Sequence, residues 1–363
     1  MYEDAGYDEV YLKRCFKLAA KGAGTVSPNP LVGTVIVKND KVIGEGFHQK
    51  HGAPHAEVEA FNNSTEDVGG ATLYCNLEPC CHTKKQTPPC VPLIINKKIA
   101  RVVISNLDPN PEVSGEGIKQ LRDAEIEVIN DQLNNEGEEL NKFYFNYVKT
   151  KIPYITLKVA QSTDGKITKS KNEQTWLTGE ESNQFVHQQR AAYDAVLVGA
   201  NTIKVDNPQL TVRNVEGRNP RRIILDGKLS IDLNAAVLSA EDIENTWILT
   251  SKNSDKEKIN KIIEKRARVI QFQSDDDDQI ELKDVLVKLS EKKITSLFVE
   301  GGADIFSQFM DGQYFNEIII LQAPITLGKG LNGISTSSLL NLNKISSEKI
   351  GKDLKLVYKK VNN

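Results

Sequence analysis

The 363-residue sequence has no apolar run of about 18 residues or more, the minimum that a membrane-spanning helix requires. It also lacks the start of a secretory signal, because Met1 is followed by Tyr, Glu and Asp rather than by basic and then apolar residues. We therefore expect no contact with a membrane. Both absences favour a soluble protein that stays in the cytoplasm, where it is made.

Surplus positive charge is also missing. Residues 1–150 contain 16 Lys and Arg against 21 Asp and Glu, a net charge of −5, whereas residues 151–363 contain 30 against 28, a net charge of +2. Proteins that bind DNA or RNA need a basic surface to neutralise phosphates. The acidic first half thus favours a free, nucleotide-like substrate and argues against a nucleic-acid partner.

Cysteine is scarce, and its distribution is uneven. The chain has five cysteines, and four of them lie between positions 75 and 90. A disulfide framework would spread its cysteines through the chain, whereas a cluster of this kind is typical of a metal site in a reducing compartment. We therefore expect a metal centre near residues 75–90.

The residues around that cluster predict a zinc site that performs hydrolysis. Zinc deaminases that act on nucleobases use one His and two Cys as metal ligands, together with a Glu that follows the His by two positions and does not bind the metal. His55, Cys80 and Cys90 supply the ligands, and Glu57 is the acid–base residue. Zinc with three protein ligands acidifies a water at the fourth position, and Glu57 would move its protons.

A structural zinc site is the alternative, because Cys75 or Cys81 could complete the tetrahedron as a fourth ligand. A closed site of that kind would give Glu57 no function. Cys75 also falls inside a predicted strand, where its side chain would pack as a small hydrophobic group. The catalytic interpretation is therefore preferred.

Short strands alternate with helices in both halves, which predicts two α/β domains. In the first half a polar helix over 133–147 leads out of the last strand. The boundary is expected near 147–152, just before Pro153, which gives domains 1–149 and 150–363. In the second half the strand over 296–300 brings Gly301 and Gly302 to the start of a helix, where backbone N–H groups could bind a phosphate.

A second glycine-rich segment, 328–333, has the spacing of a dinucleotide-binding fingerprint. It is not followed by a clear helix and lies outside any strand–helix–strand unit, which the fingerprint requires. We interpret it as a flexible loop.

Eight motifs occur in order through both halves of the chain. They are SPNPLVG at 27–33, HAEV at 55–58, LEPC at 77–80, TPPC at 87–90, DPNP at 108–111, STDGK at 162–166, WLTG at 176–179 and EGG at 300–302. This combination resembles the bifunctional riboflavin-biosynthesis enzymes of the RibD type, in which a diaminohydroxyphosphoribosylaminopyrimidine deaminase is fused to a 5-amino-6-(5-phosphoribosylamino)uracil reductase. The zinc motif alone is shared by many deaminases, whereas its union with the second set is specific.

The resemblance implies a cytidine-deaminase-like α/β/α sandwich followed by a dihydrofolate-reductase-like α/β domain that uses NADPH. We also expect a homo-oligomer, a dimer or a tetramer. The first domain would hydrolyse the 2-amino group of the phosphorylated pyrimidine, and the second would reduce its ribosyl chain to ribityl. The positions that match the family's NADPH contacts are Ala160, Trp176, Thr202, Asp206 and Gly302, and those that match its substrate contacts are Asn29, His82, Arg190, Leu210, Arg213 and Glu300.

Three positions depart from the family pattern. Nine residues separate Cys80 from Cys90 where the family usually has eight, and Lys84-Lys85-Gln86 replaces a Gly-Lys or Gly-Arg pair. Gln174 replaces a small hydroxyl residue, so that substrate contact is not carried over. Thr163 replaces Leu, a change expected to affect packing rather than chemistry.

Two competing functions follow from the same residues. One is a nucleoside or tRNA deaminase with an unrelated C-terminal domain, which the acidic first half disfavours. The other is an inactive, zinc-stabilised nucleotide-binding module, which the intact Glu57 disfavours.

Overall fold

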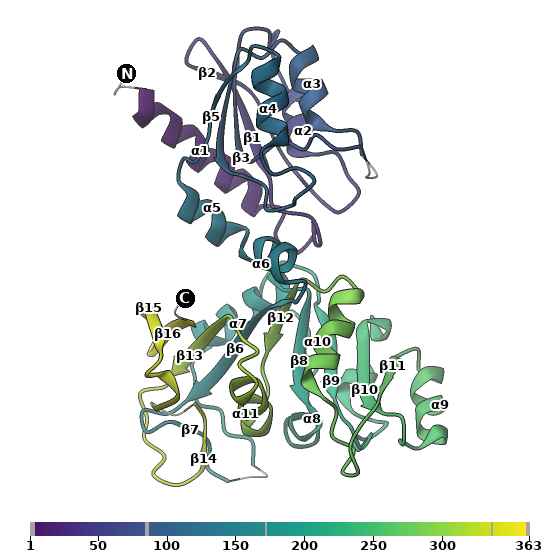
Figure 1. Ribbon diagram of the computed structural model, residues 1–363. Coiled ribbons are helices and arrows are strands. Elements are labelled where there is room, and N and C mark those ends of the chain that lie inside the picture. Colours follow the sequence, from purple (N-terminus) through teal and green to yellow (C-terminus); the bar gives the residue numbers. More distant parts are fainter. Residues whose placement is uncertain (1–3, 84–86, 171–172, 335–336, 361–363) are drawn as a thin grey trace. The chain divides into compact units, whose positions relative to one another are not determined.

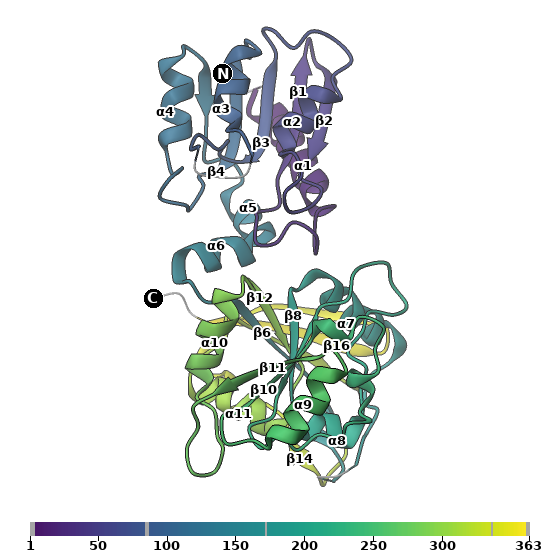
Figure 2. The same ribbon diagram turned by 90° about the vertical axis from the view of Figure 1, so that its right-hand side faces the viewer.

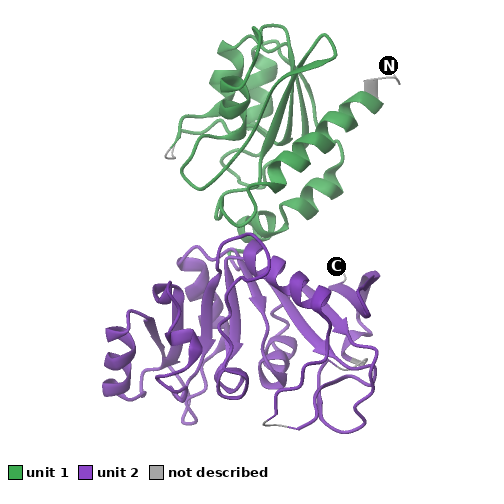
Figure 3. Cartoon of the chain, turned by 180° about the vertical axis from the view of Figure 1, so that it is seen from behind, with its two compact units in different colours: residues 1–151 green, residues 152–363 purple. Residues whose placement is uncertain are grey.

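The computed structural model describes residues 4–83, 87–170, 173–334 and 337–360. The chain forms two compact units, residues 1–151 and 152–363 (Figure 3). The division follows Lys151, which ends the last helix of unit 1 in the left-handed conformation with φ 57°. Each unit is described by itself. No helix in the described ranges has the length and apolar character needed to cross a membrane.

Unit 1 is built on a five-stranded sheet in the order β2-β1-β3-β4-β5. The hairpin β1–β2 and the pair β1–β3 are antiparallel, whereas β3, β4 and β5 run parallel. The strands are β1 (Gly33–Lys38), β2 (Lys41–Phe47), β3 (Thr72–Leu77), β4 (Arg101–Asn106) and β5 (Glu127–Ile129).

Helices cover both faces of this sheet (Figures 1 and 2). One apolar cluster joins the sheet to three helices through side chains such as Phe61, Ile94 and Leu121. The opposite face packs on the first helix through Leu12 and Leu18. The result is the predicted α/β/α sandwich. The helices are α1 (Asp4–Ala20) on one face, and α2 (Ala56–Asn62), α3 (Cys90–Asn96) and α4 (Glu116–Asp123) on the other.

The single polar helix predicted over 133–147 is wrong. The structure has two helices there, α5 (Asn134–Leu140) and α6 (Lys142–Thr150). Asn141 lies between them and is 3% exposed. Its side chain accepts the Leu31 N–H at 2.8 Å and donates to the Leu31 carbonyl at 2.9 Å. An Asn side chain that satisfies backbone groups elsewhere favours a helix break, and sequence periodicity does not reveal a partner 110 residues away.

Unit 2 contains a nine-stranded sheet among its described residues, in the order β11-β10-β9-β8-β12-β6-β13-β16-β15. The strands from β11 to β13 are parallel, and β16 and β15 add an antiparallel edge. The five residues of β8 are all buried, as expected for a parallel strand covered on both faces. The bounds are β6 (Tyr154–Gln161), β8 (Ala195–Gly199), β9 (Arg221–Leu225), β10 (Thr246–Ser251), β11 (Arg268–Phe272), β12 (Ser296–Val299), β13 (Glu317–Gln322), β15 (Leu342–Ile350) and β16 (Asp353–Lys360).

Five α-helices accompany this sheet in the described part of unit 2. Two of them, α10 and α11, pack on one face through alternate residues of β6, β8 and β12 (Figure 1). Asp255 caps α9 by accepting the N–H groups of Glu257 and Lys258. The helices are α7 (Glu180–Ala192), α8 (Ala200–Asp206), α9 (Lys256–Glu264), α10 (Leu282–Glu291) and α11 (Ala303–Asp311).

The segment 328–333 is more ordered than the flexible loop predicted from its glycines. Leu331 and Asn332 form β14, which pairs with β7 (Lys166–Thr168). The Asp164 carboxylate accepts the N–H groups of Leu327 and Gly328 at 3.0 and 2.8 Å. The described residues that follow contain only a short 3₁₀ helix, Ser337–Leu339, and no α-helix, so the segment is not a dinucleotide fingerprint.

Candidate active sites

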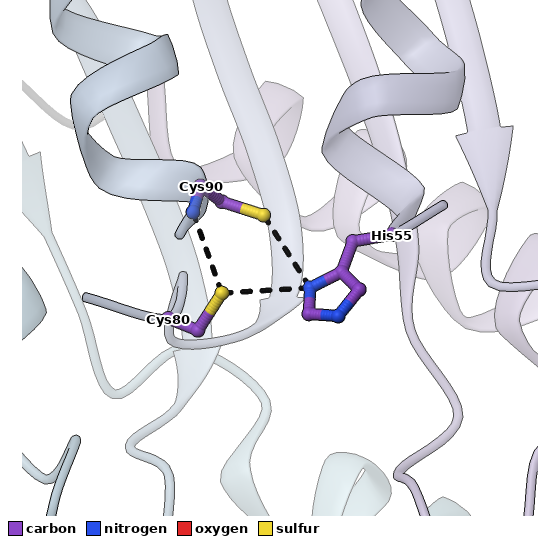
Figure 4. A group of neighbouring side chains, drawn as sticks. All are labelled: His55, Cys80 and Cys90. Carbon is purple, nitrogen blue, oxygen red and sulfur yellow. Dashed lines mark hydrogen bonds between the residues drawn. The ribbon is translucent and has the colours of Figure 1, made fainter. Parts of the chain in front are cut away.

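The first candidate site lies at the starts of two helices in unit 1 (Figure 4). His55 is the residue before α2, and Cys90 is the first residue of α3. Cys80 lies in the loop after β3, and the backbone N–H of Cys90 donates to its sulfur at 3.4 Å. Residues that are 35 positions apart in the sequence therefore face one another.

The three side chains fit a single zinc ion. Nδ1 of His55 is 3.4 Å from the sulfur of Cys80 and 3.4 Å from that of Cys90. The three ligand atoms lie within 4.8 Å of one another. Two ligands of one tetrahedral zinc with ordinary bond lengths are about 3.6 Å apart. These distances match the metal without rearrangement of the chain.

Two neighbouring groups complete the environment of this cluster. The other ring nitrogen of His55, Nε2, is 3.0 Å from the hydroxyl of Thr87, which holds the ring with Nδ1 directed at the sulfurs. Glu57 is 3% exposed, and its Oε2 is buried with no hydrogen-bond partner among the described residues. Burial, with the nearby Cys80 sulfur, raises the pKa of Glu57. A buried carboxyl group of this kind is suited to accept and release protons.

Neither cysteine proposed as a fourth ligand belongs to the cluster. Cys75 is fully buried in β3, where its sulfur accepts the Thr34 hydroxyl at 3.5 Å. Cys81 contacts the carbonyl of Glu112 at 3.9 Å instead. The arrangement supports an open, three-ligand site.

The two substrate residues expected in unit 1 lie in its loops. Asn29 is 3.1 Å from Nε2 of His48, and the His48 ring packs edge-on against that of His55, with centroids 5.5 Å apart. Nδ1 of His82 is 3.8 Å from a carboxylate oxygen of Glu112, and this buried nitrogen has no hydrogen-bond partner among the described residues. The insertion at Lys84–Gln86 lies outside the described residues.

The second candidate site is a cavity of about 1070 Å³ in unit 2. It opens where β6, β8 and β12 end, at the carboxyl edge of the parallel sheet, which is where open α/β sheets bind ligands. All nine residues predicted for this unit line it. They are Ala160, Trp176, Arg190, Thr202, Asp206, Leu210, Arg213, Glu300 and Gly302.

Glycines bring the start of α11 close to the end of β8. A Cβ at Gly301 would lie 2.6 Å from Ile305, and one at Gly199 would lie 2.8 Å from the same side chain. Gly302 precedes α11 in extended conformation. A Cβ placed at Gly302 would lie 3.8 Å from Oγ1 of Thr202, so the two residues are neighbours in the cavity wall. The open backbone at this helix start fits a phosphate of a dinucleotide.

A buried ion pair lies in the wall of the cavity. The guanidinium of Arg190 donates to both carboxylate oxygens of Glu300, at 2.6 and 3.0 Å, and to the carbonyl of Thr211 at 3.2 Å. Lys158 Nζ is 3.8 Å from the same carboxylate. Burial would raise the pKa of Glu300, but the charges of Arg190 and Lys158 outweigh it and hold the pKa below its usual range. Glu300 is therefore an anion at neutral pH.

The neighbouring loop supplies a second cationic group. Arg213 donates to the side chains of Gln209 and Thr211 at 3.1 and 2.9 Å, and its backbone N–H donates to Nδ1 of His187 at 3.0 Å. Leu210 is 2% exposed and has φ 56°, an uncommon conformation for a branched side chain. Strain of this kind is frequent at ligand sites.

Sequence reasoning missed four residues of these sites, namely Thr87, His48, Lys158 and His187. Lys158 carried a usable signal, because a lysine in the middle of an apolar strand requires a buried partner. The contacts of the other three depend on residues far away in the chain, so no local pattern predicted them.

Comparison with known proteins defines the class of each unit. Residues 6–106 match the cytidine and deoxycytidylate deaminase zinc-binding region, and residues 153–356 match the RibD C-terminal domain. The molecule thus joins a zinc deaminase unit to a pyrimidine reductase unit, and the predicted fold class is confirmed. A nucleoside or tRNA deaminase with an unrelated second domain is not favoured.

The whole chain has close relatives. It is 42% identical over 359 residues to the riboflavin biosynthesis protein RibD of Aquifex aeolicus. The matched residues make up 97% of this chain and 98% of that protein. The Thermotoga maritima structure of a diaminohydroxyphosphoribosylaminopyrimidine deaminase/5-amino-6-(5-phosphoribosylamino)uracil reductase is 36% identical, with TM-score 0.87 over 99% of this chain and all of that one. Acinetobacter baumannii RibD superposes with TM-score 0.87 at 32% identity, over 99% of this chain and 100% of that one. The chain belongs to the RibD family.

Membership of this family establishes a bifunctional enzyme of riboflavin biosynthesis, a deaminase and a reductase in one chain. Its cofactors are Zn²⁺ and NADPH. The resemblance noted from the eight motifs is confirmed.

Proposed function

We propose that residues 1–149 deaminate 2,5-diamino-6-ribosylamino-4(3H)-pyrimidinone 5′-phosphate and that residues 150–363 reduce the product, 5-amino-6-(5-phosphoribosylamino)uracil. The His55, Cys80 and Cys90 cluster carries the first assignment. The cavity that gathers all nine predicted residues of unit 2 carries the second.

In the deaminase site, His55, Cys80 and Cys90 would hold zinc, which would supply an acidified water when bound. Glu57 would take up protons released at the site and return them to the ring nitrogen and to the departing amine. In the overall reaction the water oxygen forms the new bond to the ring carbon, the bond from that carbon to the amine nitrogen breaks, and ammonia leaves a carbonyl behind. The buried, unpartnered Oε2 of Glu57 supports the role of this residue. Asn29 and His82 contact the substrate.

In the reductase site, NADPH would supply a hydride when bound, and the addition of that hydride and a proton would convert the ribosyl chain to ribityl. The residues that would hold the dinucleotide are Ala160, Trp176, Thr202, Asp206 and the turn at Gly302. The helix start beyond Gly302 supports the placement of a phosphate there. Burial raises the pKa of Asp206.

The substrate lies against Arg190, Leu210, Arg213 and Glu300. An arginine has five N–H groups, and three of those on Arg190 are used by Glu300 and Thr211. Arg213 makes only neutral contacts among the described residues. We therefore assign the main phosphate contact to Arg213, and Arg190 orients Glu300.

The test is mass spectrometry of the phosphorylated diaminopyrimidinone after incubation with the enzyme. Without NADPH, the product should show the mass change of an amine replaced by a carbonyl oxygen, with ammonia released. With NADPH, two further hydrogens should appear. Reduction before deamination would overturn the proposed order.

The acidic first half supports a free substrate and argues against nucleic acid. We also propose that the enzyme works in the cytoplasm, without a membrane, and as a homo-oligomer. Sedimentation analysis of the purified chain tests the assembly: a monomer at micromolar concentration would contradict it.

A further inference from the structure

The carboxylate of Asp353 lies at the start of α7 in unit 2. Asp353 is the first residue of β16 and is 1% exposed. Its Oδ2 accepts the backbone N–H of Gly179 at 2.7 Å and the hydroxyl of Ser182 at 2.6 Å. Residues more than 170 positions apart are thus joined by two short hydrogen bonds.

These bonds supply a helix cap that α7 cannot provide for itself. Gly179 occupies the position before the helix and has no side chain to accept a backbone N–H. In the usual capping box, the third helical residue reaches back to that N–H. Here the third residue is Ser182, which donates to Asp353 instead. A negative charge at this end of a helix is favourable.

The turn that carries Asp353 is fitted closely to the same helix start. Gly351 has φ 55°, and a Cβ there would lie 2.3 Å from a carboxylate oxygen of Glu181. A Cβ at Gly179 would lie 3.2 Å from the Lys352 side chain. The Glu181 and Lys352 side chains could move aside, but the positive φ of Gly351 favours glycine in the turn that carries Asp353.

The other carboxylate oxygen of Asp353, Oδ1, is buried and has no hydrogen-bond partner among the described residues. A buried carboxylate with an idle oxygen is unfavourable for folding. An apolar residue would avoid that cost but would leave the Gly179 N–H and the Ser182 hydroxyl without their acceptor, so this position requires a group that accepts both hydrogen bonds.

The start of α7 forms part of the cavity wall. Trp176, Leu177, Thr178 and Gly179 all line the cavity, and Arg190 lies near the other end of the same helix. Trp176 is 80% exposed, so its position depends on the segment that carries it and not on packing around the ring. The Gly179 N–H bond to Asp353 fixes the end of that segment.

We propose that Asp353 is a positioning residue of the reductase, which holds Trp176–Gly179 in the conformation that receives the dinucleotide. This inference rests on the proposed assignment of Trp176 to the NADPH site. Asp353 is not among the residues that line the cavity, and it acts only through the Gly179 N–H and the Ser182 hydroxyl.

The test measures NADPH binding to the full chain by calorimetry, together with energy transfer from Trp176 to the bound nucleotide. The chain has two tryptophans, and Trp247 is 3% exposed. Loss of the energy transfer in Trp176→Phe would therefore show that the signal comes from Trp176 and not from Trp247. Asp353→Ala should weaken NADPH binding about tenfold, the scale expected for hydrogen bonds to a charged group. Its kcat at saturating NADPH should change less than about twofold.

Asp353→Asn keeps an acceptor oxygen in place and should restore NADPH affinity to within about twofold of the native enzyme. Asp194→Asn is the matched control, because Asp194 is also a buried carboxylate but lies at the opposite end of β8 from the cavity. It should lower the melting temperature without changing the Kd for NADPH. Deaminase activity, measured in the same samples, should be unchanged throughout.

A native Kd in a folded Asp353→Ala enzyme would overturn the inference, and so would failure of Asp353→Asn to restore binding. If Asp353→Ala does not fold, Ser182→Ala decides, because it removes one of the two bonds. Weaker NADPH binding in that variant supports the inference, and an unchanged Kd overturns it. Absence of NADPH binding to the native chain would instead refute the proposed function.

Discussion

Arg190 and Glu300 pair in the wall of the reductase cavity through two parallel hydrogen bonds of 2.6 and 3.0 Å. Both side chains are largely buried, at 11% and 8% exposure. A planar guanidinium matches both oxygens of a carboxylate at once, and an ammonium group cannot. The pair thereby fixes the direction in which Glu300 presents its charge to a ligand.

Arg190→Lys keeps the positive charge but loses this two-point contact. We expect reductase kcat/KM to fall roughly 100-fold, or about 3 kcal/mol, while ammonia release in unit 1 stays native. Arg218→Lys is the matched control, since Arg218 contacts Asp194 through one nitrogen at 3.2 Å, away from the cavity. An equal loss in both variants would contradict a specific role for the Arg190 pair.

Glu57→Gln should abolish ammonia release and leave zinc bound, because we propose that the residue moves protons and does not coordinate the metal. The loss should be at least about 100-fold, in line with general acid–base catalysis. Zinc content by atomic absorption and NADPH oxidation with the deaminated intermediate are the two controls. A parallel fall in zinc content would reassign Glu57 as a ligand.

Serine substitutions distinguish the ligands from the neighbouring cysteine. Cys80→Ser and Cys90→Ser should each lose zinc, since their sulfurs lie 3.4 Å from Nδ1 of His55. Cys81→Ser should retain the metal, because that sulfur faces the Glu112 carbonyl. Zinc stoichiometry decides the matter, and metal loss from Cys81→Ser with retention in Cys80→Ser would show the assignment to be wrong.

Removal of zinc should separate the two activities. The only His/Cys cluster with metal-ligand geometry in the described residues is His55, Cys80 and Cys90. After treatment with a chelator, the full chain should release no ammonia but should still titrate NADPH, and added Zn²⁺ should restore deamination. A parallel loss of NADPH binding would show that the second site also needs the metal.

Asp108 should make the stability of unit 1 depend on pH. It accepts the N–H of Asn110 at 2.8 Å and the hydroxyl of Tyr144 at 2.9 Å, and burial raises its pKa from 3.8 to about 6. Between these two values, the folded state binds a proton that the unfolded state lacks. The stabilisation is therefore complete below about pH 4 and is lost as pH rises through about 6.

The comparison of native enzyme with Asp108→Asn isolates this effect, because Asn cannot titrate. Their difference in unfolding free energy should change by about 2 kcal/mol between roughly pH 4.5 and 7.5. The native enzyme should lose stability relative to the variant as pH rises. The unfolding transition of unit 1 is the one to measure, and it can be recognised because removal of zinc should shift it. Parallel pH profiles would contradict the raised pKa.

The sequence predicted most reliably what depends on short segments. The zinc residues lie within 36 positions, at the ends of elements that their own sequence defines, and the structure brings them together. The roles of Asn141 and Asp353 could not be predicted from the sequence, because each side chain hydrogen-bonds to backbone groups more than 100 residues away. Family resemblance through the eight motifs selected nine residues of unit 2 that line one cavity, whereas physical reasoning alone would have left Arg190 on a surface helix.

The position of β16 in the chain has a consequence for protein synthesis. All elements of unit 1 lie before residue 152, so its zinc cluster can form while the ribosome is still translating unit 2. The central strand β6 of unit 2 must wait for β13 beside it, and α7 must wait for Asp353. A nascent chain should thus gain the deaminase early, and the reductase only after Asp353 has been translated.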